Sequence, residues 1–291
     1  MPLRDGYTLM HEHITIDLSS VKKSTDCILD CYEETVQELK KLYQFGVRNI
    51  VDVTNMGMGR NPEYVSKIEA ETGIHMIQST GFYKEPFLPD AVYNQSEEEL
   101  SMLMENEIVH GIGNKSIKAE MIGEIGTSKN KMEPMEKKIF EAAAKVAIKT
   151  GKPIYTHTTL GTYGIEQAKF LLTRGVNPQK IVIGHIDLAG NLDYIREVLK
   201  EGVFVGFDTI GKNNYFPDEE RVNYLMVLEQ LDLLDQVVLS MDLTRKSHLQ
   251  YKGGIGYSYL FERFLPMLRN AGMMEENIQK MLIFNPKKIF S

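Results

Sequence analysis

Eight short β-rich runs recur along this chain, and segments with helical period separate most of them. The clearest helical segment is 134–150, where Pro134 suits a first helical turn and Gly151 suits the residue after a helix end. Segments 218–234 and 257–271 have a similar pattern. Regular strand–helix alternation favours a parallel sheet of the α/β class, and eight repeats favour closure into a (β/α)8 TIM barrel. The expected strands are residues 8–14, 49–54, 75–80, 119–125, 153–158, 180–186, 203–209 and 236–242.

The length of the chain agrees with one barrel. Its 291 residues lie within the usual range for a single α/β barrel domain. No linker rich in Ser, Pro or Gly and no low-complexity tract divides it, so we expect one domain over residues 1–291. A doubly wound open sheet is the structural competitor. That fold would carry a Gly-rich dinucleotide loop after the first strand, where this chain has the residues HEHI at 11–14 instead.

Composition excludes several partners. The net charge of −7 argues against a nucleic-acid groove, which needs a concentrated basic face. The chain has no run of about 18 apolar residues, so we expect no membrane span. Charged residues from Arg4 onward interrupt any signal-peptide core. The two cysteines, Cys27 and Cys31, have a spacing that fits neither a zinc CxxC pair nor a disulfide framework. We expect a cytoplasmic protein with a small-molecule substrate, and a homodimer is kept open as its assembly.

Potential metal ligands stand at the ends of five of the expected strands. His11 and His13 are two residues apart, so in a strand both side chains point to one face and can chelate one ion. A lone histidine at a strand end is more often a hydrogen-bonded structural residue, but here the placement is repeated. The carboxyl ends of barrel strands form the catalytic face. Four imidazoles and two carboxylates at this face predict a two-metal hydrolase site. Its residues are His11, His13, Glu124, His157, His185 and Asp242.

Two glutamates of the fourth expected strand, Glu120 and Glu124, could supply the carboxylate of the site. Glu120 lies in the same expected strand and shares its parity, but it would lie about 13 Å lower at a rise of ~3.3 Å per residue. Glu124 is at the top of the strand and can bridge two cations. The alternative is a capping or ion-paired glutamate at a strand end.

These motifs together resemble the phosphotriesterase family of the amidohydrolase superfamily, and most closely its phosphotriesterase homology protein subgroup. The similarity rests on HEH in the first strand, an acid in the fourth, THT in the fifth, GH in the sixth, SMD in the eighth and the closing FNPKKIF. Most of the wider family has a carboxylated lysine on strand 4, where this chain has Glu124. That difference matches the subgroup and sets the chain apart from the family's phosphotriesterases and lactonases.

The resemblance implies a role for each ligand. His11, His13 and Asp242 would hold the buried metal, His157 and His185 the more exposed one, and Glu124 would bridge both. The expected cofactors are two divalent ions, with zinc the expected metal because it accepts imidazole and carboxylate ligands. The expected mechanism is attack by a metal-bridging hydroxide on an ester, lactone or phosphoester, with Asp242 as the catalytic residue that accepts the proton.

The expected substrate-facing residues follow the strands. They are Tyr83 after strand 3, Lys212 and Tyr215 after strand 7, and Arg245 and His248 after strand 8. Phosphate sites in barrels often use the loops after strands 7 and 8, and a branch of the family resembling lactonases of phosphorylated sugars has a similar lysine and arginine there. We therefore predict a small phosphorylated lactone or ester, with its phosphate on Lys212 and Arg245. Where that branch has a tyrosine, this chain has His248.

Two other classes of function remain alternatives. One is a mononuclear, deaminase-like amidohydrolase, although the chain lacks the HxGE-like segment expected to supply its proton-donating glutamate. The other is a non-catalytic metal-binding barrel. The number of bound metals separates the first alternative from a binuclear hydrolase, and turnover of any ester or lactone separates both enzymes from the second alternative.

Overall fold

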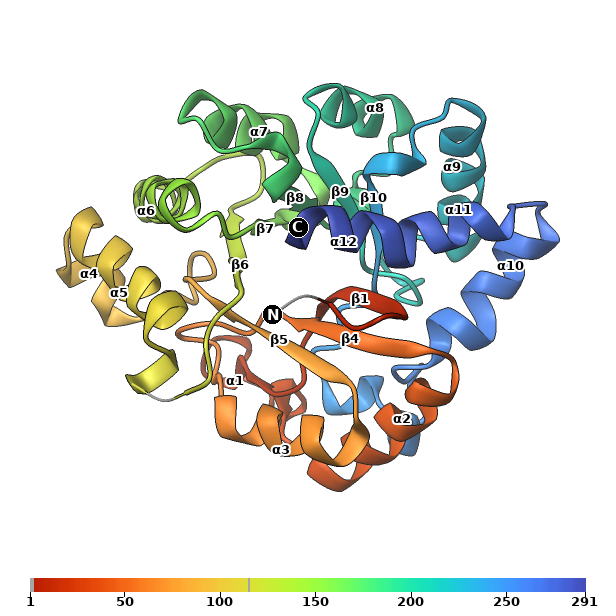
Figure 1. Ribbon diagram of the computed structural model, residues 1–291, viewed down its shortest axis with the longest axis horizontal. Helices are drawn as coiled ribbons and strands as arrows, with labels where there is room; N and C mark the ends of the chain where they lie inside the picture. The colour runs from red at the N-terminus through yellow and green to blue at the C-terminus, as the bar shows by residue number, and fades with distance from the viewer. Residues whose placement is uncertain (1–2, 115) are drawn as a thin grey trace.

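The computed structural model describes residues 3–114 and 116–291, and a sheet of eight parallel strands forms its centre (Figure 1). Strand order follows the chain, each strand pairing with the next, and the first and last strands lie against each other in a nearly closed barrel. The predicted (β/α)8 fold is confirmed. The barrel strands are β1 Tyr7–Glu12, β4 Val47–Asp52, β5 His75–Thr80, β6 Met121–Thr127, β7 Ile154–Thr158, β8 Ile181–Gly184, β9 Phe204–Phe207 and β10 Val237–Leu239.

Helices surround the strands, and a small antiparallel hairpin of β2 (Ile16–Asp17) and β3 (Ile28–Leu29) lies in the connection after β1 (Figure 1). Within the described residues, no helix combines the length and the apolar character needed to cross a bilayer. The helices are α1 Ser19–Lys22, α2 Tyr32–Gln44, α3 Pro62–Thr72, α4 Asp90–Asn94, α5 Glu97–Val109, α6 Pro134–Thr150, α7 Gly164–Thr173, α8 Leu192–Lys200, α9 Asp218–Gln230, α10 Leu265–Asn270, α11 Glu275–Gln279 and α12 Asn285–Phe290.

The predicted helix 134–150 has the expected bounds because both ends are well specified. Glu133 forms a capping box with Glu136, and Pro134 stands in the first turn. Gly151 ends the helix at φ 70°, a left-handed conformation that costs glycine little. Between these ends, the face that carries Ile139 and Phe140 is buried against the barrel.

The other two expected helices differ from the prediction. The segment expected at 218–234 ends at Gln230. Over 257–271 the chain forms a π-helical stretch, Leu260–Phe264, that leads into α10. Pro266 explains the second difference, because proline has no N–H to donate to the carbonyl four residues earlier and the helix widens before it.

The barrel interior is filled at one end and open at the other. A side chain from each of the eight barrel strands points inward and forms a buried layer, which α12 and Leu3 cover at the strands' amino ends. Figure 1 shows α12 crossing in front of the strands, with the C-terminus near the middle of the view. The carboxyl ends of the strands are therefore free to carry a site. The inner layer consists of Met10, Val51, Val53, Ile77, Met121, Tyr155, Val182, Phe204, Val238 and Ile289.

Local irregularities in β1 and β6 turn particular side chains toward that open end. The pairing of β1 with β4 shifts register between Leu9 and Glu12, and β6 shifts against β7 between Ile122 and Ile125. Such shifts interrupt strict alternation of side chains between the two faces of a strand. As a result Met10 belongs to the inner layer while the adjacent His11 also faces inward and contacts Tyr155, with ring centroids 4.9 Å apart.

Candidate metal centre

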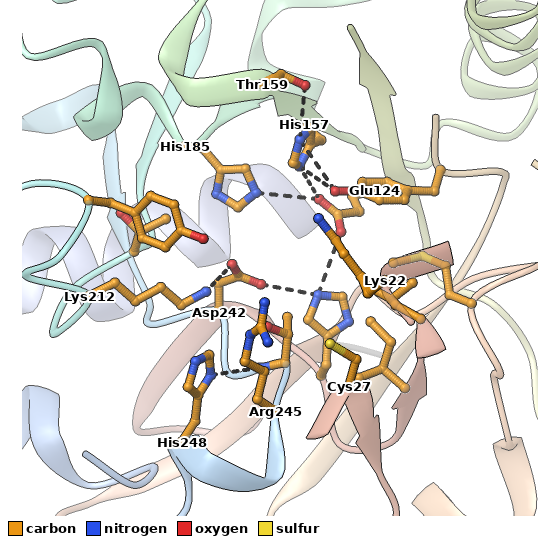
Figure 2. A pocket seen from close by; sticks show the side chains of 18 of the residues that line it. Lys22, Cys27, Glu124, His157, Thr159, His185, Lys212, Asp242, Arg245 and His248 are labelled. Carbon is orange, nitrogen blue, oxygen red and sulfur yellow. Dashed lines mark hydrogen bonds and ion pairs between the residues drawn. The ribbon is translucent and has the colours of Figure 1, made fainter. Parts of the chain in front are cut away.

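The six predicted ligands lie close together at the carboxyl end of the barrel, and Figure 2 shows Glu124, His157, His185 and Asp242 among them. Glu124 lies in the middle of the cluster. One of its oxygens, Oε1, is 3.5 Å from Nε2 of His13. The other, Oε2, is 3.1 Å from Nδ1 of His157 and 3.5 Å from Nε2 of His185. The carboxylate thus faces histidines from β1 on one side and from β7 and β8 on the other.

Among the described residues the potential ligand atoms form three groups. One consists of His11, His185 and Asp208, and the other two share the carboxylate of Glu124. Of these two, His11, His13 and Glu124 make the first group, and Glu124, His157 and His185 make the second, with the ligand atoms of each group within 4.8 Å of one another. Asp242 adds to the first group, because its Oδ1 lies 3.5 Å from Nε2 of His11 and 3.2 Å from Nε2 of His13.

The buried nitrogens of this cluster fit a metal. Both ring nitrogens of His11 and Nε2 of His13 are buried and have no hydrogen-bond partner within the described part of the chain. Buried polar atoms are normally satisfied, so unpartnered ones aimed at carboxylates call for another partner. Neutral imidazole nitrogens and carboxylate oxygens are the donor set that zinc and similar divalent ions accept.

Asp208, a residue that the sequence reasoning missed, orients His185. Its Oδ1 accepts hydrogen bonds from Nδ1 (2.8 Å) and from the backbone N–H (2.9 Å) of His185, and its Oδ2 accepts one from Tyr155 (2.6 Å). Burial acts to raise the pKa of Asp208, but His185 and His11 lower it to about 2. The carboxylate is therefore ionised and leaves Nε2 of His185 facing Glu124, as the carboxylate partner of a metal-binding histidine does.

His13 has a comparable support from β4. Its Nδ1 is 2.8 Å from the hydroxyl of Thr54, and Asp52 accepts a hydrogen bond from the Thr54 backbone N–H (3.0 Å). Nε2 of His13 is then left to face Glu124 and Asp242. Burial acts to lower the pKa of His13, but the neighbouring Asp242 and Glu124 raise it above its ordinary value.

Two of the candidate ligands have unfavourable backbone conformations. His185 has φ 55° and Asp242 has φ 53°, values in the left-handed region that few residues with a side chain adopt. Such strain persists only where the surrounding structure fixes it, and it is concentrated at functional sites. His185 directly follows β8, and Asp242 lies in the connection after β10, which ends at Leu239, so both conformations occur where the chain passes over the mouth.

Lys212 forms an ion pair with Asp242. Its Nζ donates to Oδ2 of Asp242, and both side chains are largely buried. Burial acts to raise the pKa of Asp242, but Lys212, His11 and His13 hold it well below its ordinary value. Asp242 is therefore ionised, with one oxygen held by Lys212 and the other facing the histidines of β1.

The other predicted substrate residues line one cavity of about 450 Å³ above the ligands (Figure 2). Tyr83 is buried, and its hydroxyl lies 3.3 Å from His157. Arg245 is 3.7 Å from Asp26, and Tyr215 is 55% exposed at the rim. His248 accepts a hydrogen bond from the backbone N–H of Thr244 (3.1 Å). These side chains therefore lie around the mouth of the barrel, in the position that the sequence predicts for them.

Comparison with known proteins identifies the family to which this chain belongs. The chain matches the phosphotriesterase family over residues 2–290. It belongs to that family. The phosphotriesterase homology protein of Escherichia coli (strain K12) is 46% identical over 285 residues, which is 98% of each chain. Its crystal structure, complexed with phosphate in the active site, has a TM-score of 0.96 at 45% identity and covers 98% of this chain and 99% of that one.

Two more distant phosphotriesterase relatives are named for the reactions they catalyse. The aryldialkylphosphatase of Saccharolobus solfataricus is 32% identical over 299 residues, covering 98% of this chain and 95% of that protein. The phospho-furanose lactonase of Mycoplasmopsis synoviae is 31% identical over 314 residues, covering 98% and 88%. Both names describe hydrolases. Family membership together with the ligand cluster makes this chain a metal-dependent hydrolase.

Proposed function

We propose that this protein uses two zinc ions to hydrolyse an ester, lactone or phosphoester, and that a small phosphorylated lactone is its substrate. The observation that carries the proposal is the position of Glu124, whose carboxylate is shared by two groups of histidines. A single ion would need only one of those groups. A carboxylate between the two groups is an arrangement that suits a pair of divalent ions.

Divalent ions bound there would lower the pKa of water and polarise the oxygen of the bond to be cleaved. The protein residues supply the rest of the chemistry. Asp242 is ionised and its Oδ1 faces the centre of the cluster, so it can accept the proton of the attacking water. Lys212 holds the second oxygen and fixes the direction of the carboxylate. Tyr83 covers His157 from the side of β5.

The choice of substrate rests on the cavity and on the relatives. A volume of about 450 Å³ suits a small molecule. One relative is named a phospho-furanose lactonase, and another is crystallised with phosphate in its active site. Lys212 and Arg245 remain proposed contacts of the substrate phosphate. Each already faces a carboxylate, Asp242 and Asp26 respectively, so a phosphate there would compete with these acids.

The test is a metal analysis joined to an activity screen. Purified protein should contain two zinc ions per chain and should hydrolyse at least one member of a panel of lactones, phosphorylated lactones, carboxyl esters and organophosphate triesters. One ion per chain, with deamination in place of ester cleavage, would favour the mononuclear alternative. Two ions without turnover of any member of the panel would contradict the proposed reaction.

A further inference from the structure

Four cationic side chains line the cavity, and only two of them are paired. Lys212 contacts Asp242 and Arg245 faces Asp26. Lys22 and Lys84 also line the cavity, on the side formed by the connections after β1 and β5. Over residues 3–114 and 116–291, neither of these two lysines forms an ion pair with a carboxylate. Figure 2 shows Lys22 pointing into the cavity toward the ligand cluster.

The two unpaired lysines lie around the same aromatic ring. Nζ of Lys22 is 5.5 Å and Nζ of Lys84 is 5.7 Å from the ring centroid of Phe87. Nζ of Lys84 is also 5.7 Å from the ring of Tyr83 and donates one hydrogen bond to the Glu85 carbonyl (2.8 Å). Both distances to Phe87 lie within the range of cation–π attraction. The remaining N–H groups of both lysines are available to a ligand in the cavity.

This arrangement is unfavourable without an anion. Lys84 is partly buried, and burial lowers its pKa while Glu136 opposes the shift and Lys22 adds to it. Placing two like charges beside one ring costs free energy that an opposite charge between them would recover.

Glu136, the acid that most raises the pKa of Lys84, and Asp26, an acid of the cavity lining, are already engaged. The carboxylate of Glu136 accepts hydrogen bonds from the backbone N–H groups of Glu85 (3.2 Å), Ser128 (3.0 Å) and Glu133 (2.7 Å). Asp26, the acid in the cavity wall, accepts from both the backbone and the hydroxyl of Ser247. Neither carboxylate is free to turn toward the two lysines.

We infer that Lys22 and Lys84 form an anion-binding subsite that holds a phosphate monoester or carboxylate group of the substrate, away from the bond that is cleaved. The inference deepens the proposed function and rests on it for the identity of the reaction. It places the negatively charged group on the side of the cavity formed after β1 and β5, as an alternative to Lys212 and Arg245, which are already paired with Asp242 and Asp26. The experiment below decides between the two places. Charged hydrogen bonds from two ammonium groups around one anion are strong and set which substrates bind.

The experiment compares substrates that differ in one charge. A lactone with a side-chain phosphate, the same ring with a carboxylate, and the same ring with a hydroxyl are assayed with wild type, Lys22→Ala, Lys84→Ala, Lys22→Arg and Arg245→Ala. The control is Lys246→Ala, which removes a rim lysine paired with Asp30 (2.7 Å). Calorimetry with the phosphate-bearing hydroxy acid, the hydrolysis product, measures binding without turnover.

Lys22→Ala and Lys84→Ala should each lower the kcat/KM ratio of an anionic to the neutral lactone by at least about 10-fold, and weaken product binding by a similar factor. Lys22→Arg should retain most of the preference, and Lys246→Ala should match wild type. The substrate that loses more, phosphate or carboxylate, identifies the anion. An unchanged ratio in both alanine variants, with a fall in Arg245→Ala alone, would overturn the inference and leave the hydrolase intact. If no member of the panel is hydrolysed, the proposed function fails, and calorimetry alone decides the subsite.

Discussion

Asp208 holds both the ring and the backbone of His185, with its Oδ1 2.8 Å from Nδ1 and 2.9 Å from the backbone nitrogen. We predict that Asp208→Asn lowers zinc affinity by about 10–100-fold, because the amide keeps the size of the side chain but loses the charge that supports the imidazole. Competition with a chromophoric chelator measures the affinity. Asp193→Asn, at an exposed position on α8, is the control. Equal affinities of Asp208→Asn and wild type would show that Asp208 does not support the site.

Asp242 has a predicted role as a proton acceptor in addition to its contacts with His11 and His13. In Asp242→Asn the side chain keeps one oxygen but loses its basicity. We expect kcat to fall by at least about 100-fold, while zinc content measured by atomic emission stays close to that of wild type. Near-full turnover with both ions bound would remove Asp242 from proton transfer.

We predict that Glu124, as the bridging carboxylate, makes the assembly of the site independent of carbon dioxide. A lysine in this place must first be carboxylated, whereas the glutamate is ready when the chain folds. Protein stripped of metal and reconstituted with zinc should therefore regain the same activity with and without bicarbonate. Glu124→Gln should bind less than half of the wild-type zinc under both conditions. A strong bicarbonate requirement in wild type would mean that a carboxylated lysine, and not Glu124, is the bridge.

Much of this organisation could be read from the sequence because it depends on strand ends. His157 and His185 were identified since each follows an apolar run, and the carboxyl ends of parallel strands meet at one face. Asp208 has the same signal, because it lies within the expected strand 203–209 and immediately after β9, but the sequence reasoning did not select it. The pairing of Lys212 with Asp242 was not predictable, because loop conformation decides it and the pattern of residues places both only in the same sector.

The parity of residues along the strand does not explain why Glu124 points inward. Parity grouped it with Glu120, but Met121 belongs to the inner layer while Glu124, three residues later, also points inward. The register shift between Ile122 and Ile125 makes this arrangement feasible. Strand irregularities of this kind depend on the neighbouring strands, so hydrophobic period alone does not reveal them. Glu120 instead pairs with Lys152 next to the start of β7.

Glu12 lies between His11 and His13 and links the end of β1 to the segment that follows β10. Its carboxylate accepts hydrogen bonds from the Ser240 hydroxyl (2.8 Å) and from the backbone N–H groups of Met241 (2.8 Å) and Leu243 (3.1 Å). We expect Glu12→Gln to lower the free energy of unfolding by about 1–3 kcal/mol, because an amide N–H group would face a buried donor. Urea unfolding, with zinc and with chelator, measures the change.

The exposed Glu33 on α2 gives the matched control for that experiment, as Glu33→Gln removes the same charge without a buried partner. A loss seen only in the presence of zinc would place Glu12 in metal binding and not in closure of the barrel. Equal stabilities of Glu12→Gln and wild type in both conditions would contradict the proposed role.

His248 should make the fold sensitive to acid. Burial, with Lys212 and Arg245 nearby, lowers the pKa of His248 from 6.5 to about 4, and its Nδ1 must be unprotonated to accept from Thr244. Between about pH 4 and pH 6.5 the unfolded chain therefore binds more protons than the folded chain. The contribution of His248 to the free energy of unfolding is complete above about pH 6.5 and is lost as the pH falls toward 4. In the presence of a metal chelator, the free energy of unfolding of wild type should fall by on the order of 1–2 kcal/mol more than that of His248→Gln over this interval, allowing for partial exposure.

Urea unfolding at pH 7 and pH 4.5 measures this difference, with His110→Gln at an exposed position as the control. Parallel losses in wild type and His248→Gln would show that His248 does not set the acid limit.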